Sequence, residues 1–107
     1  MTKLSATQEK ILAKAKADID KARNMDFYDW FRSNSSYYSN STNEKIEAEV
    51  ERLDWWKNYY NDNKSGIAHT HCNGKTIAKL QSLGLIEILY DSTNKAYNYD
   101  LIKVLNY

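Results

Sequence analysis

The chain has 107 residues, of which 42% are hydrophobic and 27% are charged, and its formal net charge is +1. This length suits a single domain with one hydrophobic core, and the large share of aromatic residues excludes an intrinsically disordered chain. A net charge so close to zero also excludes a protein whose affinity for nucleic acid would follow from overall charge alone.

Charge is unevenly distributed along the chain. Residues 1–24 carry a net charge of +3, residues 25–62 carry −4 and residues 63–107 carry +2. Basic ends could meet phosphate groups while the acidic middle repels them, so any contact with nucleic acid should be directional. The alternative is that these charged residues only lie on solvent-exposed helix faces, as surface charges ordinarily do.

Several common targeting signals are missing from the sequence. No stretch approaches the roughly 20 apolar residues that span a bilayer. The N-terminus MTKLSATQEK lacks the apolar centre of a signal peptide, and the single Cys72 cannot form an internal disulfide. We therefore expect a cytoplasmic protein that makes no membrane contact.

A first long helix is expected over residues 6–24. Ser5 and Gln8 have the spacing of a capping box, in which each side chain bonds the backbone of the other. Apolar residues then recur at steps of three and four, while Lys10, Lys14 and Lys21 lie off this stripe. The aromatic segment 25–31, MDFYDWF, predicts a short helix, and the polar run 33–42 predicts a loop.

A second long helix is expected over residues 42–61. Ser41 and Glu44 repeat the capping-box spacing, and apolar residues follow at helical intervals. One side of this helix is acidic and its end is aromatic, with Trp55, Trp56, Tyr59 and Tyr60 in sequence. Four aromatic residues so close together either fill the core or contact a partner.

The C-terminal part begins with a strand-like segment, IAHTHC, at residues 67–72. Asn73 is a suitable N-cap for a helix over 74–83, and Gly84 stands where helices commonly end in a left-handed residue. Residues 85–90 then read as a strand, 91–95 as a turn and 96–104 as a returning strand.

This order of elements resembles half of a known fold. Residues 73–104, and above all TIAKLQSLGLIEI at 76–88, resemble the recognition helix and wing of winged-helix DNA-binding domains. In that family the helix enters the major groove and the wing turn touches phosphate or the minor groove. The resemblance implies DNA contacts from Lys75, Thr76, Lys79, Gln81, Ser82 and Lys95. The family has a short helix directly before the recognition helix, where this chain has IAHTHC instead.

The sequence offers little for catalysis or metal binding. His69, His71 and Cys72 are clustered, but a structural zinc site needs a fourth ligand and no further Cys or His is present. Adjacent residues on a strand point to opposite faces, which separates Cys72 from a neighbouring histidine base. Three glycines are too few for a phosphate-binding loop. We expect no metal, no cofactor and no enzymatic activity.

The expected architecture is a mainly helical α+β single domain over residues 1–107. A helical part, 1–62, contains two long helices and a short aromatic helix, which pack on a winged-helix-like helix and β-hairpin in residues 67–107. The leading hypothesis is a small regulatory DNA-binding protein. Because so few lysines would neutralise few phosphates, it could bind as a homodimer. Its residue usage, with 12 lysines against 3 arginines, is typical of an AT-rich genome and looks like that of a bacteriophage protein.

The alternative hypothesis is a protein that inhibits a host nuclease or defence system, as anti-CRISPR proteins do. Its partner would be a host protein with a basic surface. The contact would come from the acidic and aromatic residues of the helix predicted over 42–61, namely Glu47, Glu51, Asp54, Trp55 and Tyr59. The sequence identifies neither the DNA target nor the protein partner.

Overall fold

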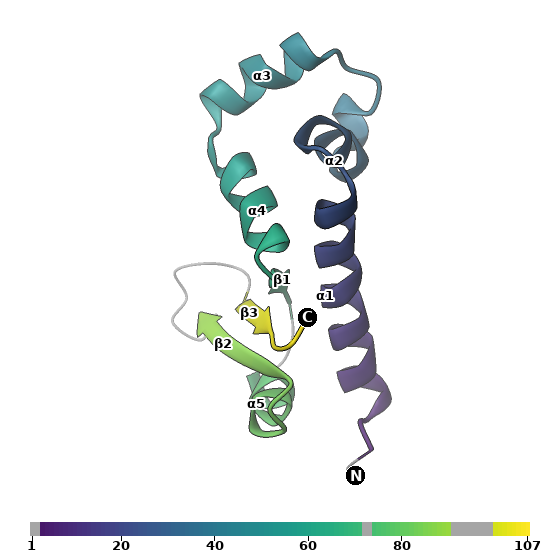
Figure 1. Ribbon diagram of the computed structural model, residues 1–107, viewed down its shortest axis with the longest axis vertical. Helices are drawn as coiled ribbons and strands as arrows, with labels where there is room; N and C mark the ends of the chain where they lie inside the picture. Colours follow the sequence, from purple (N-terminus) through teal and green to yellow (C-terminus); the bar gives the residue numbers. More distant parts are fainter. Residues whose placement is uncertain (1–2, 72–73, 91–99) are drawn as a thin grey trace.

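Five α-helices, one short 3-10 helix and a three-stranded antiparallel sheet make up the described residues 3–71, 74–90 and 100–107 of the computed structural model (Figure 1). The helices are α1 (Ala6–Asn24), α2 (Phe27–Asn34), η1 (Ser36–Tyr38), α3 (Asn43–Arg52), α4 (Trp55–Lys64) and α5 (Gly74–Ser82). The strands are β1 (Ile67–Thr70), β2 (Ile86–Tyr90) and β3 (Asp100–Val104). The expected mainly helical α+β class is confirmed.

Helix α1 has the predicted start and bounds. The backbone N–H of Gln8 donates to Ser5 Oγ at 3.2 Å, and the backbone N–H of Ser5 donates to Gln8 Oε1 at 2.9 Å. These two bonds satisfy amides that have no partner within the helix. The buried side of the helix carries Leu12, Ala15, Ile19 and Ala22.

Helix α2 extends into the segment that was expected to be a loop. Asp26 caps its start by accepting from the backbone N–H of Asp29 at 2.8 Å. At its end, Ser33 Oγ and Asn34 Nδ2 both donate to the carbonyl of Trp30, at 2.7 and 2.8 Å. The loop prediction for residues 33–42 is therefore wrong in part, because these polar side chains support the last helical turn and η1 follows.

The prediction of one helix over residues 42–61 is wrong. Two helices, α3 and α4, are separated at Leu53, whose φ of −132° and ψ of 83° are not helical. Thr42, not Ser41, caps α3 by accepting from the backbone N–H of Lys45 at 3.3 Å. The break turns the chain so that both helices pack against α2, and it buries residues of each helix in one aromatic cluster.

Buried side chains form two clusters where the sequence suggested one core. The first cluster lies between α1, α5 and the sheet and contains, among others, Ile19, Ile77, Leu80 and Ile102. The second lies between α1, α2, α3 and α4 and consists of Ala22, Trp30, Phe31, Ile46, Val50 and Tyr60. Because α1 contributes to both clusters, it connects the two halves of the molecule.

The sheet has the strand order β1-β3-β2, with antiparallel neighbours. The strand expected within IAHTHC is confirmed as β1, which pairs Ala68 with Ile102 of β3. Helix α5 ends at Ser82, and Gly84, which has a φ of +75°, follows it. The backbone N–H groups of Leu85 and Gly84 donate to the carbonyls of Leu80 and Gln81, at 3.2 and 2.9 Å. These two bonds form a Schellman motif, which only a left-handed residue such as glycine closes without strain.

This layout is compatible with a winged-helix-like arrangement in its coarse features. A helix is followed by two antiparallel strands, and an earlier strand completes the small sheet. One difference concerns the link between β1 and α5, which comprises only residues 71–73. A helical turn takes about 3.6 residues, so this link has no room for the helix that precedes a recognition helix in the family. The Asn73 cap and the turn over 91–95 lie outside the described residues.

The molecule is elongated, with principal extents of 49 × 29 × 20 Å and a radius of gyration of 15.2 Å. A compact chain of this length would have a radius of about 13 Å. Helix α3 lies at one end, while α5 and the start of α1 lie at the other (Figure 1). Among the helices of the described residues, none is long and apolar enough to cross a membrane.

The role of α1 gives a stability prediction. Ile19→Ala should lower the free energy of unfolding by about 2–5 kcal/mol, because Ile19 is fully buried. Urea denaturation should show the same midpoint by circular dichroism and by the fluorescence of the aromatic cluster, since α1 joins both halves. Leu89→Ala, at a side chain that is 44% exposed, should change stability by less than about 0.5 kcal/mol. Two separate midpoints would contradict the coupling.

Candidate functional site

The exposed face of α5 carries most of the residues that the sequence assigned to DNA contact. Ile77 and Leu80 are buried against the sheet, whereas Lys75, Lys79, Gln81 and Ser82 are exposed. Thr76 is only half-buried and lines a groove beside α1. No acidic residue occurs within the helix, so the surface it presents is cationic or neutral. Lys95 lies outside the described residues.

Two of these polar side chains already have partners within the fold. Gln81 Oε1 accepts from the backbone N–H of Ile88 at 2.7 Å, which ties α5 to β2. Ser82 Oγ donates to the carbonyl of Lys79 at 2.7 Å. The amide N–H groups of Gln81 remain as donors, and the charged groups on this face are the two lysines.

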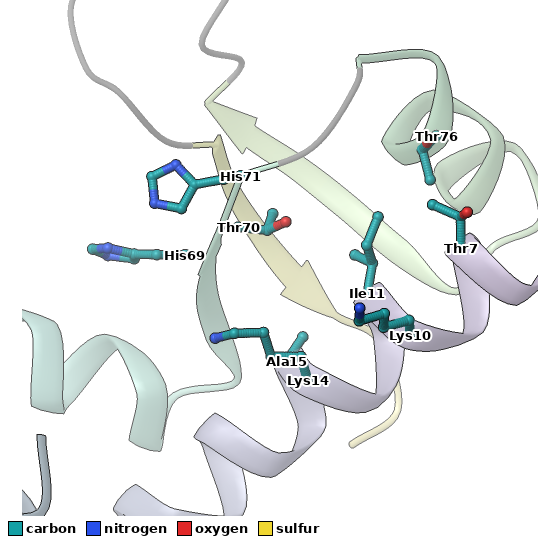
Figure 2. Close-up of a pocket in the computed structure, with 9 residues that line it drawn as sticks. All are labelled: Thr7, Lys10, Ile11, Lys14, Ala15, His69, Thr70, His71 and Thr76. Atoms are coloured by element: carbon teal, nitrogen blue, oxygen red, sulfur yellow. The ribbon is translucent and has the colours of Figure 1, made fainter.

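A groove lies beside α5, between the start of α1 and strand β1 (Figure 2). Its volume is about 440 Å³. Figure 2 shows Thr7 and Thr76 close together at one end, with the two histidines at the other and the lysines along α1. The lining residues are Thr7, Lys10, Ile11, Lys14, Ala15, His69, Thr70, His71 and Thr76.

Among these described lining residues there are two lysines, two histidines and three threonines but no carboxylate. Asp18 of α1 pairs with Lys14 at 3.1 Å. The sequence interpretation missed this groove, because it treated Lys10 and Lys14 only as residues off the apolar stripe. Thr7, Lys10 and Lys14 follow each other at steps of three and four residues, which places them on one face of the helix. This spacing was the sequence signal that could have indicated a polar face there.

His69 is the most constrained group of the groove. Its ring lies against that of Tyr59, with centroids 4.2 Å apart. Burial lowers the pKa of His69, the neighbouring charge of Asp62 raises it in part, and His71 lowers it further. Burial in turn raises the pKa of Asp62. Among the described residues, no group of three or more His, Cys, Asp or Glu side chains is placed to hold a metal ion, and Cys72 lies outside them.

The acidic and aromatic residues of the alternative hypothesis lie on α3, on α4 and at Asp54 between these helices. Glu47, Glu51 and Asp54 are exposed, and Trp55 is 47% exposed and stacks on Trp56 with centroids 4.2 Å apart. Tyr59 differs, because its ring packs inside against His69 and Trp30. The other aromatic side chains of this region, including Trp30 and Phe31, mostly belong to the buried cluster.

Helix α3 and the exposed face of α5 therefore lie toward opposite ends of an elongated molecule, with α4 between them (Figure 1). Comparisons with protein-family models, with curated proteins and with solved structures found no match.

The environment of His69 gives a pH prediction. Its pKa, measured by NMR titration of the ring, should lie below the usual value of 6.5. Below pH 6.5 the unfolded chain then binds a proton that the folded protein does not, so this group should make stability fall as pH falls through that window. Tyr59→Ala should expose the ring and raise its pKa, whereas Tyr37→Ala, at a side chain that is 78% exposed, should not. A wild-type value at or above 6.5 would overturn this interpretation.

Proposed function

We propose that this protein binds DNA through the exposed face of α5 and acts as a small winged-helix-like regulator. The observation that carries the proposal is the composition of α5, whose exposed face carries Lys75 and Lys79 and whose residues 74–82 include no acid. The acidic residues of α3 lie at the opposite end. A duplex would therefore be attracted to one end and repelled by the other.

The dimensions of α5 suit a helix in the major groove. An α-helix with its side chains is about 10–12 Å across, which fits the roughly 12 Å width of that groove, and α5 has nine residues to lie along it. Lys75 and Lys79 lie four residues apart, on the same side of the helix. They would contact phosphates or guanine edges, and the amide of Gln81 would donate to a base acceptor.

The small number of cations sets the expected strength of binding. Each phosphate neutralised contributes about 0.9 to the slope of log K against log salt concentration, so two lysines correspond to a slope of about −2. Binding by one molecule would be weak and sensitive to salt. A homodimer would double the number of contacts, and the regulatory role favours the region upstream of the protein's own gene as its target.

The DNA proposal predicts the effect of removing the two lysines. Lys75→Ala/Lys79→Ala should weaken duplex binding and reduce the salt slope by about 2, measured by fluorescence anisotropy at low salt. The matched control is Lys45→Ala/Lys57→Ala, which removes the same charge from α3 and α4 and should leave the slope unchanged. Absence of binding to both the upstream region and a random duplex would reject the proposal.

A second candidate function is supported by the exposed Trp55. A tryptophan that is nearly half exposed and follows the exposed Glu51 and Asp54 in the sequence has the character of a protein-binding hot spot for a basic surface. We propose as the alternative that this surface inhibits a nuclease or defence protein of the host, in the manner of anti-CRISPR proteins.

This alternative predicts that Trp55→Ala weakens binding to the inhibited protein by about 2 kcal/mol or more, which is roughly a 30-fold change. Pull-down from phage-infected host cells, followed by calorimetry with the recovered protein, measures it. Tyr37→Ala is the control, because it removes another exposed aromatic ring, one that contacts Tyr38 and Lys45. Equal binding by wild type and Trp55→Ala would reject this surface.

A further inference from the structure

We propose that the groove between α1, β1 and α5 is a binding site for a phosphate group. The site is distinct from the exposed face of α5 on which the proposed function rests. Its walls come from three elements, and its volume of about 440 Å³ lies in the range of pockets that hold small ligands (Figure 2).

Several polar groups of the groove have no partner within the described part of the chain, although Lys14 pairs with Asp18 at 3.1 Å. There, the hydroxyls of Thr7, Thr70 and Thr76 and the ammonium of Lys10 make no hydrogen bond or ion pair with another residue. Thr70 is only 9% exposed, and Figure 2 shows its hydroxyl directed toward α1. Thr7 and Lys10 are exposed at the mouth of the groove, whereas Thr70 is nearly buried, and their free donors can bond a ligand that enters the groove.

The side chains that line the groove indicate the type of ligand that it would bind. Lys10, Lys14 and the threonine hydroxyls present hydrogen-bond donors, and none of the described lining residues is a carboxylate that would repel an anion. None of the lining residues is an arginine, whose planar fork is the usual partner of a carboxylate. Here each donor can make one hydrogen bond, and the donors come from opposing walls. Such an arrangement suits a tetrahedral group with several acceptor oxygens, as in a phosphate ester.

The phosphate could belong to a nucleic-acid backbone or to a phosphorylated small molecule, since the recognition chemistry is the same. Helix α5 contacts both regions, because Thr76 lines the groove while Lys75 and Lys79 lie on its exposed face. The two sources can therefore be distinguished by which residues respond to each probe.

The experiment is an NMR titration of the full chain with inorganic phosphate, adenosine monophosphate and a DNA duplex in turn. Potassium chloride at equal ionic strength is the control for screening. Inorganic phosphate should shift the amides around Thr7, Lys10, Thr70 and Thr76. Lys10→Ala/Lys14→Ala should weaken this binding by at least about tenfold, because it removes charged donors. Lys45→Ala/Lys57→Ala, of equal charge, should leave it unchanged.

The phosphate proposal is overturned if phosphate shifts these amides no more than chloride does, or if the two double variants bind it alike. Tighter binding of the nucleotide, with groove amides unmoved by the duplex, supports a small-molecule ligand. A duplex that shifts groove and α5 amides together, and binds less well to Lys10→Ala/Lys14→Ala, supports a backbone phosphate. If phosphate binds and the duplex does not, the phosphate site is supported and the DNA proposal is rejected. Failure of one proposal can therefore be distinguished from failure of the other.

Discussion

The packing of α1 is the constraint on which the rest of the structure depends. Its buried side supplies Ile19 to the cluster beneath the sheet and Ala22 to the aromatic cluster. Near its end, Arg23 donates to the carbonyls of Lys64 and Tyr107, both at 3.1 Å. These bonds attach the end of α4 and the C-terminal residue to the same helix. The orientation of α1 therefore sets both halves of the molecule and one wall of the groove.

This arrangement separates two kinds of surface. At one end, the start of α1 and α5 present lysines and hydroxyls beside a groove without carboxylates. At the other, α3 presents glutamates beside an exposed tryptophan. A net charge of +1 conceals this separation, because the opposite charges nearly cancel over the whole chain. The local charge of each end bears on function more directly than the net charge of the whole chain does.

Local signals in the sequence identified the local structure well. The capping box at Ser5 and the glycine at position 84 gave the start of α1 and the end of α5, since both depend on residues a few positions apart. The break at Leu53 was missed because apolar residues keep helical spacing across it, and only packing against α2 requires the turn. The groove was missed for a similar reason, since residues 7–15 and 69–76 meet only in the folded chain.

The most direct measurement of the central claim, that the lysine-bearing end binds DNA, is hydrogen–deuterium exchange of the full chain with and without a short duplex at low salt. Amide exchange reports locally which segments are protected. Binding through the α5 end predicts protection of residues 74–82, with residues 43–64 unchanged. Protection confined to residues 43–64, or no protection anywhere, would contradict it.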